Sequence, residues 1–186
     1  MNMAIFLDRD GTINVDTGYV YKVEDLKFED NALKGLKLLQ IPEYLLIIVT
    51  SQSGIGRGMY TEQDYHKFMK AMYERFRTEG ISIDGEYFCP HHPKEGIGRY
   101  KVDCECRKPN TGMLEQAAKD FDIDLSKSFV IGDKTEDIEM GRRAGCKTIL
   151  VRTGKGGKDK NFDVNPDYTA NDFLEAAKHI MDRKDF

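Results

Sequence analysis

The 186-residue sequence contains no apolar run that approaches the roughly 18 residues of a membrane-spanning helix. It also lacks an excess of basic residues, since its formal net charge is -4, whereas a general nucleic-acid binder usually presents a basic face. No charged leader followed by an apolar segment opens the chain, so we expect no secretory signal and a cytoplasmic location. Neither a membrane nor a nucleic acid is therefore expected as a partner.

Internal repeats are also missing, as are linkers that would mark a second domain. We therefore expect one domain over residues 1–186, long enough to bury a substantial core, and a monomer. Cysteine is scarce, with four residues, of which three lie in the 18-residue stretch 89–106 beside histidines. In a cytosolic chain this clustering favours a metal site over disulfide bonds.

Short apolar runs alternate with segments of helical periodicity. The runs predict buried strands at residues 3–7, 45–49, 85–89, 128–131 and 148–151. The periodic segments predict helices at residues 32–39 with Asn31 as the N-cap, from Thr61 through 76, and at 113–121, 137–144 and 172–181. Strands that alternate with helices predict an α/β fold with a doubly wound parallel sheet.

Polar side chains stand at the ends of three of these strands. Asp8 and Asp10 follow the first strand, Thr50 follows the second, and Asp133 follows the strand at 128–131. The carboxyl ends of the strands in an open parallel sheet are where ligands bind. Two carboxylates as close as Asp8 and Asp10 are unfavourable unless a cation lies between them or one holds a proton.

The charges near these strand ends favour magnesium-dependent phosphate chemistry. Four acids contribute four negative charges, while a magnesium ion and two neighbouring cations return four positive ones. Such a site admits a phosphate dianion that the carboxylates alone would repel. The residues counted are Asp8, Asp10, Asp133, Asp137, Arg107 and Lys108.

Together these fragments resemble the motifs of the haloacid dehalogenase-superfamily phosphatases. In chain order the motifs are Asp8-x-Asp10-Gly-Thr, Thr50, Lys108 and Gly132-Asp133-x-x-x-Asp137. The resemblance covers most of the chain, and it implies the doubly wound fold of that superfamily. It also implies a phosphatase activity that uses Mg²⁺.

The same resemblance implies a role for each motif residue. Asp8 would be the nucleophile that forms an aspartyl-phosphate, and Asp10 would protonate the leaving alcohol and then activate water. Thr50 and Lys108 would hold the phosphoryl oxygens, and Arg107 is counted with the catalytic residues beside them. The ligands implied for Mg²⁺ are Asp8, the carbonyl of Asp10 and Asp133, with Asp137 behind them.

Two tight pairs of cysteine and histidine predict a second metal site in the loop at about 89–106. Three thiolates and one imidazole suit tetrahedral zinc, and four protein ligands leave no position for water, so this zinc would be structural. The predicted ligands are Cys89, His91, Cys104 and Cys106. The alternatives are reduced cysteines in a loop, and His92 as the ligand in place of His91.

The position of this zinc loop narrows the resemblance. In the superfamily, caps that select substrates are inserted between the first and second motifs or between the second and third. The zinc loop lies between Thr50 and Lys108, so we expect a zinc-clamped loop and no separate cap domain. The pattern resembles the D-glycero-D-manno-heptose-1,7-bisphosphate 7-phosphatases and the related histidinol-phosphate phosphatases, in residues 16–20, 50–58, 89–93, 104–109 and 132–134.

This narrower resemblance implies a small phosphorylated sugar as substrate, with the 7-phosphate of a heptose bisphosphate removed. Histidinol phosphate is the rival substrate, and a non-catalytic zinc-loop binding protein is the rival of another class. The family usually has Asn in place of Ser51 and often His in place of Thr17, two departures near the sugar. The implied substrate contacts are Asp16, Thr17, Gly18, Tyr19, Thr50, Ser51, Gln52, Ser53, Arg107, Lys108 and Lys134.

Two further features are interpreted separately. Residues 154–158 invite comparison with a phosphate-binding P-loop but lack its spacing and the Ser or Thr after the Lys. We expect a mobile loop at the mouth of the site there. Cys146 enters an apolar strand and is expected to be a thiol of the core.

Overall fold

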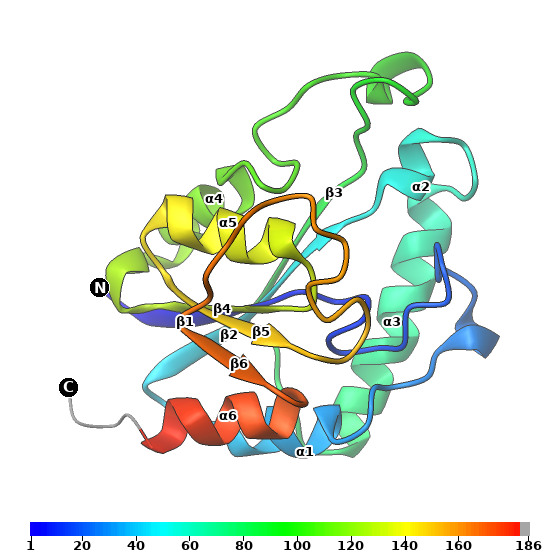
Figure 1. The fold of residues 1–186 in the computed structure, drawn as a ribbon. Helices are drawn as coiled ribbons and strands as arrows, with labels where there is room; N and C mark the ends of the chain where they lie inside the picture. The colour runs from blue at the N-terminus through cyan, green and yellow to red at the C-terminus, as the bar shows by residue number, and fades with distance from the viewer. Residues whose placement is uncertain (183–186) are drawn as a thin grey trace.

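The computed structural model describes residues 1–182, and its strands form one sheet in which every pairing is parallel. Within the described residues the sheet has six strands in the order β3-β2-β1-β4-β5-β6 (Figure 1). The strands are β1 (Met3–Leu7), β2 (Tyr44–Ser51), β3 (Gly85–Cys89), β4 (Phe129–Gly132), β5 (Lys147–Val151) and β6 (Tyr168–Ala170).

Helices cover both faces of the sheet. One face packs against α4 and α5, and the other against α1, α3 and α6 (Figure 1). None of the helices in residues 1–182 is long and apolar enough to cross a membrane. The helices are α1 (Ala32–Leu38), α2 (Ser53–Gly56), α3 (Glu62–Thr78), α4 (Gly112–Phe121), α5 (Thr135–Ala144) and α6 (Phe173–Asp182), with single 3₁₀ turns at Val23–Asp25, Gly98–Tyr100 and Leu125–Lys127.

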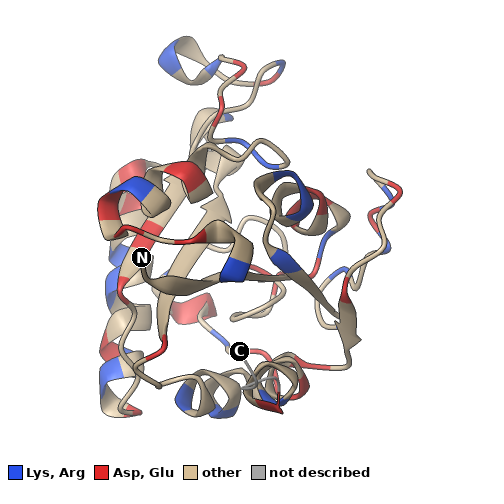
Figure 2. Ribbon diagram, turned by 90° about the vertical axis from the view of Figure 1, so that its left-hand side faces the viewer, with Lys and Arg blue, Asp and Glu red and all other residues tan. Residues whose placement is uncertain are grey.

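The central strand β1 is apolar on both sides because helices cover both faces. Ile5 and Leu7 join the cluster that includes α3 and α6, whereas Ala4 and Phe6 join the cluster that includes α4. All four side chains are fully buried. The charged residues lie mainly on the helices and loops around the sheet (Figure 2), so the continuous apolar run marks a strand at the centre of the fold.

The strand order reverses between β1 and β4, which is the switch point where open α/β sheets bind ligands. Leu7 pairs with Ile131, and the Asp8 amide donates a hydrogen bond to the Ile131 carbonyl at 2.9 Å. The residues that follow β1 and β4 therefore emerge side by side. This geometry brings the first and fourth predicted motifs together.

The predicted doubly wound sheet is confirmed, with three local differences. Asn31 precedes α1 but does not cap it: its backbone is left-handed, with φ of 64°, and its amide donates to Asp172 at the start of α6 instead. The sequence interpretation missed α2 and β6, which have four and three residues. Elements this short produce little periodicity.

The zinc loop projects from the carboxyl edge of the sheet between β3 and α4 (Figure 1, green). Backbone hydrogen bonds within the loop stabilise it: the His92 amide donates to the Tyr100 carbonyl, and the Gly96 amide donates to the His92 carbonyl. The Ile97 amide also donates to the Gly56 carbonyl, which ties the zinc loop to α2. Within residues 1–182, no separate cap domain interrupts the segments after β1 or β3, as the sequence predicts.

Candidate active site

Three carboxylates and one ammonium group form the centre of the site. The Lys108 Nζ atom donates to Asp8 Oδ1 and to Asp137 Oδ1, each at 2.6 Å. Asp133 completes the acid group, and one oxygen of each acid lies within 4.8 Å of the others. Four residues from three separated motifs thus meet at the switch point.

The unpaired oxygens of this acid group point to a cation site. Asp8 Oδ2 and Asp133 Oδ1 are buried and have no hydrogen-bond partner within residues 1–182, which is unfavourable unless a cation or a proton is present. Asp137 differs, because Lys108 and the Lys134 amide occupy both of its oxygens. The residues present fit a magnesium ion bound by Asp8 and Asp133, with Asp137 behind them.

Burial and mutual repulsion divide the three acids electrostatically. Burial opposes ionisation of Asp8, but the Lys108 and Lys134 charges outweigh it and hold the Asp8 pKa below its usual value. Burial, with the charges of Asp8 and Asp137, raises the pKa of Asp133 to about 9. Burial and the Asp8 charge raise the pKa of Asp137 to about 7. Asp8 is therefore the acid held ionised, as a nucleophile requires.

Glycines allow two loops to close on Asp133. A Cβ atom on Gly11 or Gly154 would lie 2.4 or 2.2 Å from Asp133 Oδ2. The Lys155 amide instead donates to that oxygen at 2.6 Å, and the Gly157 amide donates to the Asp133 carbonyl. The predicted loop at 154–158 therefore lies at the site and contacts a candidate magnesium ligand through its backbone.

The Asp10 carboxylate lies apart from the acid group and is held by donors from three residues. The Arg9 guanidinium is fully buried and contacts both oxygens, at 2.6 and 2.7 Å. Asn14 donates to Oδ1 at 2.9 Å and Gln52 to Oδ2 at 3.0 Å. The Arg9 Cζ atom lies 4.6 Å from the centroid of the Phe68 ring, a cation–π contact that suits a buried planar cation. The sequence interpretation missed these partners of Asp10.

Thr50 lies at the end of β2, and its hydroxyl oxygen accepts a 2.8 Å hydrogen bond from the Gln52 amide. The oxygen of that amide accepts a 2.6 Å hydrogen bond from the Tyr60 hydroxyl. Gln52 and Thr50 are both buried. The structure thus connects the second predicted motif to the Asp10 carboxylate through one side chain.

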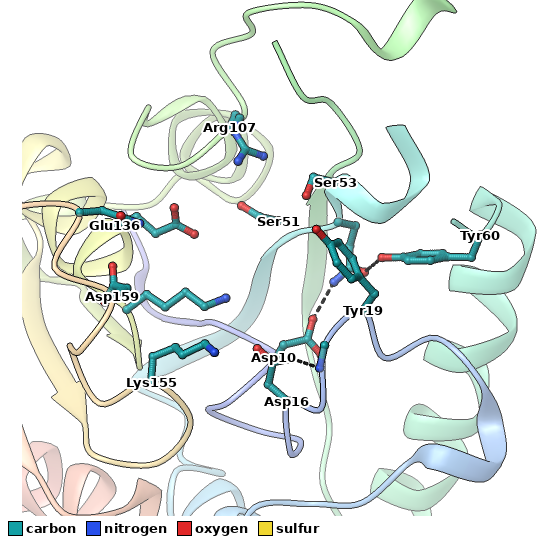
Figure 3. Close-up of a pocket in the computed structure, with 14 residues that line it drawn as sticks. Asp10, Asp16, Tyr19, Ser51, Ser53, Tyr60, Arg107, Glu136, Lys155 and Asp159 are labelled. Carbon is teal, nitrogen blue, oxygen red and sulfur yellow. Dashed lines mark hydrogen bonds between the residues drawn. The ribbon is translucent and has the colours of Figure 1, made fainter. Parts of the chain in front are cut away.

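A cavity of about 400 Å³ opens beside these residues (Figure 3). Basic and acidic side chains both line it, so it suits a ligand that carries both phosphate and hydroxyl groups. Its lining residues are Asp10, Asp16, Gly18, Tyr19, Ser51, Gln52, Ser53, Tyr60, Arg107, Lys134, Glu136, Lys155, Asp159 and Asn161.

Nine of the predicted site residues line this cavity, whereas Asp8, Thr50 and Lys108 are buried beside it and Thr17 is exposed outside the lining. Tyr60, Glu136, Lys155, Asp159 and Asn161 line it without having been predicted as site residues. Glu136 directly precedes the motif residue Asp137, and this position in the sequence is the one feature that could have indicated it as a site residue. Lys155 lies in the loop at 154–158 that the sequence places at the mouth of the site, and Asp159 directly follows that loop.

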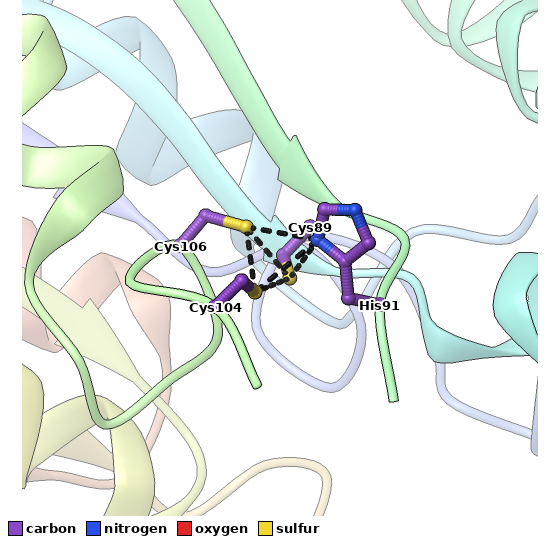
Figure 4. A group of neighbouring side chains, drawn as sticks. All are labelled: Cys89, His91, Cys104 and Cys106. Atoms are coloured by element: carbon purple, nitrogen blue, oxygen red, sulfur yellow. Dashed lines mark hydrogen bonds between the residues drawn. The ribbon is translucent and has the colours of Figure 1, made fainter. Parts of the chain in front are cut away.

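The cysteine and histidine pairs converge in the zinc loop (Figure 4). Cys89, Cys104 and Cys106 have sulfur–sulfur distances of 3.0–3.5 Å, and His91 Nδ1 lies 3.2–3.8 Å from the three sulfurs. Tetrahedral zinc with Zn–S bonds of about 2.3 Å needs edges of roughly 3.5–3.8 Å. The four ligand atoms converge on one point, with several separations shorter than those edges, so they form a candidate metal site, whereas His92 contacts Arg57 and Glu95 instead.

This cluster is joined to the cavity through Arg107. The residue follows Cys106 directly, and its guanidinium donates to the His91 carbonyl at 3.2 Å. Hydrogen bonding with Cys89 lowers the pKa of the Cys106 thiol to about 5, although burial acts in the opposite direction. At least one thiolate is thus available to a metal near neutral pH.

Comparison with known proteins identifies relatives of the chain. A family model described as HAD-hydrolase-like matches residues 105–176. The D-glycero-beta-D-manno-heptose-1,7-bisphosphate 7-phosphatase of Haemophilus ducreyi is 49% identical over 154 residues, which cover 82% of this chain and 84% of that protein. The D-glycero-alpha-D-manno-heptose-1,7-bisphosphate 7-phosphatase of Burkholderia mallei is 50% identical over 150 residues, 81% of this chain and 79% of that protein.

A solved structure has a similar fold over nearly the whole length of this chain. The D,D-heptose 1,7-bisphosphate phosphatase from B. bronchiseptica, complexed with magnesium and phosphate, has a TM-score of 0.86 and 27% identity, and covers 98% of this chain and 99% of its own. The chain therefore belongs to the haloacid dehalogenase-like hydrolases, in the family of the D-glycero-D-manno-heptose-1,7-bisphosphate 7-phosphatases.

Proposed function

We propose that this protein removes the 7-phosphate of D-glycero-D-manno-heptose 1,7-bisphosphate, with Asp8 as the nucleophile. One observation carries the chemistry: Lys108 bridges Asp8 and Asp137 at the switch point, while Asp8 keeps a second buried oxygen free of hydrogen bonds. The names of the relatives support the substrate. A binding module has no need for this arrangement.

The reaction divides into two steps. In the first, an Asp8 oxygen attacks phosphorus, the bond from phosphorus to the sugar oxygen breaks, and Asp10 gives its proton to that oxygen. In the second, Asp10 takes a proton from water, the water oxygen attacks phosphorus, and the bond to Asp8 breaks. Thr50 and Lys108 stabilise the phosphoryl oxygens throughout.

Magnesium is the catalytic cofactor in this proposal. Asp8, the Asp10 carbonyl and Asp133 would hold it, and Asp137 would act through Lys108 and the Lys134 amide. When bound, it neutralises negative charge on the phosphoryl oxygens and on the acid group. Both orphaned carboxylate oxygens then gain a partner.

Zinc is the structural metal in this proposal, held by Cys89, His91, Cys104 and Cys106. Its place is supported by the four convergent ligand atoms, none of which is among the residues that line the cavity. The clamp would fix Arg107, whose guanidinium is held by the His91 carbonyl.

The cavity side chains would recognise the sugar and its distal phosphate. Arg107, Lys134 and Lys155 supply positive charge, while Asp16 and Glu136 offer acceptors for hydroxyl groups. Carboxylates discriminate sugar hydroxyls well because they accept two hydrogen bonds in fixed directions. The remaining contacts would come from Thr17, Gly18, Tyr19, Ser51 and Ser53.

A substrate panel tests this function. Phosphate release is measured with both anomers of the heptose bisphosphate, with histidinol phosphate and with p-nitrophenyl phosphate. We expect kcat/KM for one heptose anomer to exceed that for histidinol phosphate by about 100-fold or more. The product should be heptose 1-phosphate. A preference for histidinol phosphate would refute the substrate, and no turnover of any phosphomonoester would refute the enzyme.

A further inference from the structure

We propose that Gln52 is a positioning residue for both chemical steps, oriented by Tyr60 and acting on Thr50 and Asp10 together. The inference rests on the proposed function, because it assigns these contacts a part in that reaction. Gln52 is 2% exposed, and its amide makes three hydrogen bonds, all to side chains of the site.

Tyr60 determines which way the Gln52 amide points. The Tyr60 hydroxyl lies 2.6 Å from Gln52 Oε1, and an amide oxygen only accepts hydrogen bonds, so Tyr60 donates. The Tyr60 ring stacks on Tyr21, with centroids 4.7 Å apart and planes 10° apart, which fixes the hydroxyl. Burial raises the Tyr60 pKa well above its usual value, so this donor keeps its proton.

With its oxygen held, Gln52 directs both of its N–H groups into the catalytic residues. The Gln52 Nε2 atom lies 2.8 Å from Thr50 Oγ1 and 3.0 Å from Asp10 Oδ2, so one N–H group can donate to each oxygen. Because Thr50 accepts from Gln52, its own hydroxyl proton is left for another acceptor. Within residues 1–182, the Thr50 hydroxyl donates to no protein group. A phosphoryl oxygen is the acceptor that this site supplies.

The same amide fixes the distance between two catalytic groups. Arg9 and Asn14 hold Asp10 from the side of β1, and neither contacts Thr50. Among the hydrogen bonds of residues 1–182, only those of Gln52 join the proton-transfer carboxylate to the group that binds the phosphoryl oxygens. Such positioning lowers the barrier of both steps without adding binding energy. A positioning role therefore predicts a lower kcat, whereas a direct substrate contact predicts a higher KM.

Steady-state kinetics of three variants test this role, using the best substrate of the panel. Gln52→Met removes the amide and keeps the chain length, Tyr60→Phe removes one hydroxyl, and the third variant combines both. We expect kcat to fall about 10–100-fold in Gln52→Met and about 3–10-fold in Tyr60→Phe. KM should stay within about threefold in both. The double variant should match Gln52→Met, because Tyr60 acts only through Gln52.

Tyr73→Phe is the matched control, since the Tyr73 hydroxyl donates to Glu86 outside the cavity. It should keep the kcat of the unmodified protein. Thermal unfolding measures the folded state of each variant. If Gln52→Met does not fold, Tyr60→Phe decides alone: a threefold or larger fall in kcat at constant KM supports the role.

Three results would overturn the inference: an unchanged kcat in Gln52→Met, a raised KM at constant kcat, or additive effects in the double variant. These failures differ from failure of the proposed function. If the unmodified protein hydrolyses the substrate and the variants match it, only the role of Gln52 is refuted. If the unmodified protein releases no phosphate, the function itself is refuted.

Discussion

The Lys108 ammonium lies 2.6 Å from Asp8 Oδ1, across a sequence separation of 100 residues. Both side chains are buried, so this ion pair has little competition from water. Lys108 also bonds Asp137 at the same distance. Its single charge therefore orders the proposed nucleophile and one further acid of the group at once.

Replacing Asp8 with its amide tests the nucleophile. Asp8→Asn keeps the shape of the side chain but removes the charge that attacks phosphorus, so turnover should fall by about 10⁴-fold or more. Phosphate release in an enzyme assay measures it, together with a thermal unfolding scan. Asp122→Asn is the control, because Asp122 is exposed and lies beside Met1 and Asn2, at the opposite end of β1 from Asp8. Substantial hydrolysis by Asp8→Asn would exclude Asp8 as the nucleophile.

Arg107 and Lys108 should behave differently although they are adjacent. Lys108→Met removes the charge nearest the reacting group and should lower kcat by about 10²–10³-fold. Arg107 lines the cavity, so Arg107→Ala should mainly raise KM, by about tenfold. Arg99→Ala is the control in the same zinc loop, since Arg99 is exposed and bonds Glu62. If Lys108→Met mainly raised KM and Arg107→Ala mainly lowered kcat, the proposed positions of these two side chains relative to the reacting phosphate would be refuted.

Removing one acid should stabilise the magnesium-free protein. Burial and like charges raise the pKa of Asp133 to about 9. Near pH 8 the folded protein must bind a proton at Asp133 that the unfolded chain does not hold. The Asp133→Asn variant avoids this cost, so its unfolding free energy should rise by about 1–3 kcal/mol, or several degrees in Tm. The same variant should lose magnesium-dependent activity. An unchanged or lower Tm in EDTA would contradict the charge argument.

The sign of this effect depends on pH. Because the folded-state pKa of Asp133 lies above its ordinary value of 3.8, the folded protein holds this proton more tightly than the unfolded chain does. The contribution of Asp133 to the free energy of unfolding is therefore fully present below about pH 4 and is lost as the pH rises toward 9. The gain from Asp133→Asn should be small near pH 4 and grow toward pH 8, as measured by unfolding scans across that range.

The main features of fold and site could be predicted because the chemistry and the apolar patterning coincide along the chain. Residues such as Leu7 and Ile131 lie in uninterrupted apolar runs, and a parallel sheet requires their polar successors to meet at one edge. The cysteine and histidine pairs were also close enough in sequence to predict a shared site. Those ligand atoms converge as expected.

The remaining features depended on contacts that no local pattern encodes. Asn31 resembles a helix cap, yet tertiary contact with Asp172 takes its side chain. Gln52 lines the cavity, and its expected contact with substrate stays a prediction, but the hydrogen bonds of its amide to three protein groups could not be foreseen. Asp159 reaches the cavity because its carboxylate accepts hydrogen bonds from Thr135 at the start of α5. Pairings of this kind depend on the folded arrangement of distant loops.

The last prediction is that the two metals are separable. In the proposed site few protein oxygens would hold magnesium, so the ion should exchange: mild EDTA treatment should stop hydrolysis and added Mg²⁺ should restore it. Zinc held by four protein ligands should survive that treatment, at about one atom per chain by elemental analysis. Cys106→Ser should lose the zinc, whereas Cys146→Ser should keep it, since Cys146 lies outside the cluster.

Loss of zinc should also lower activity, although no zinc ligand lines the cavity. The cause is the contact from Arg107 to the His91 carbonyl, because a loosened zinc loop no longer fixes that guanidinium. We expect KM to rise about tenfold in Cys106→Ser, as in Arg107→Ala. A variant that combines Cys106→Ser with Arg107→Ala should have a KM no higher than that of either single variant. The β-sheet should persist by circular dichroism, because its strands pair independently of the zinc loop. A zinc-free Cys106→Ser protein with unchanged kcat/KM would separate the metal clamp from substrate recognition.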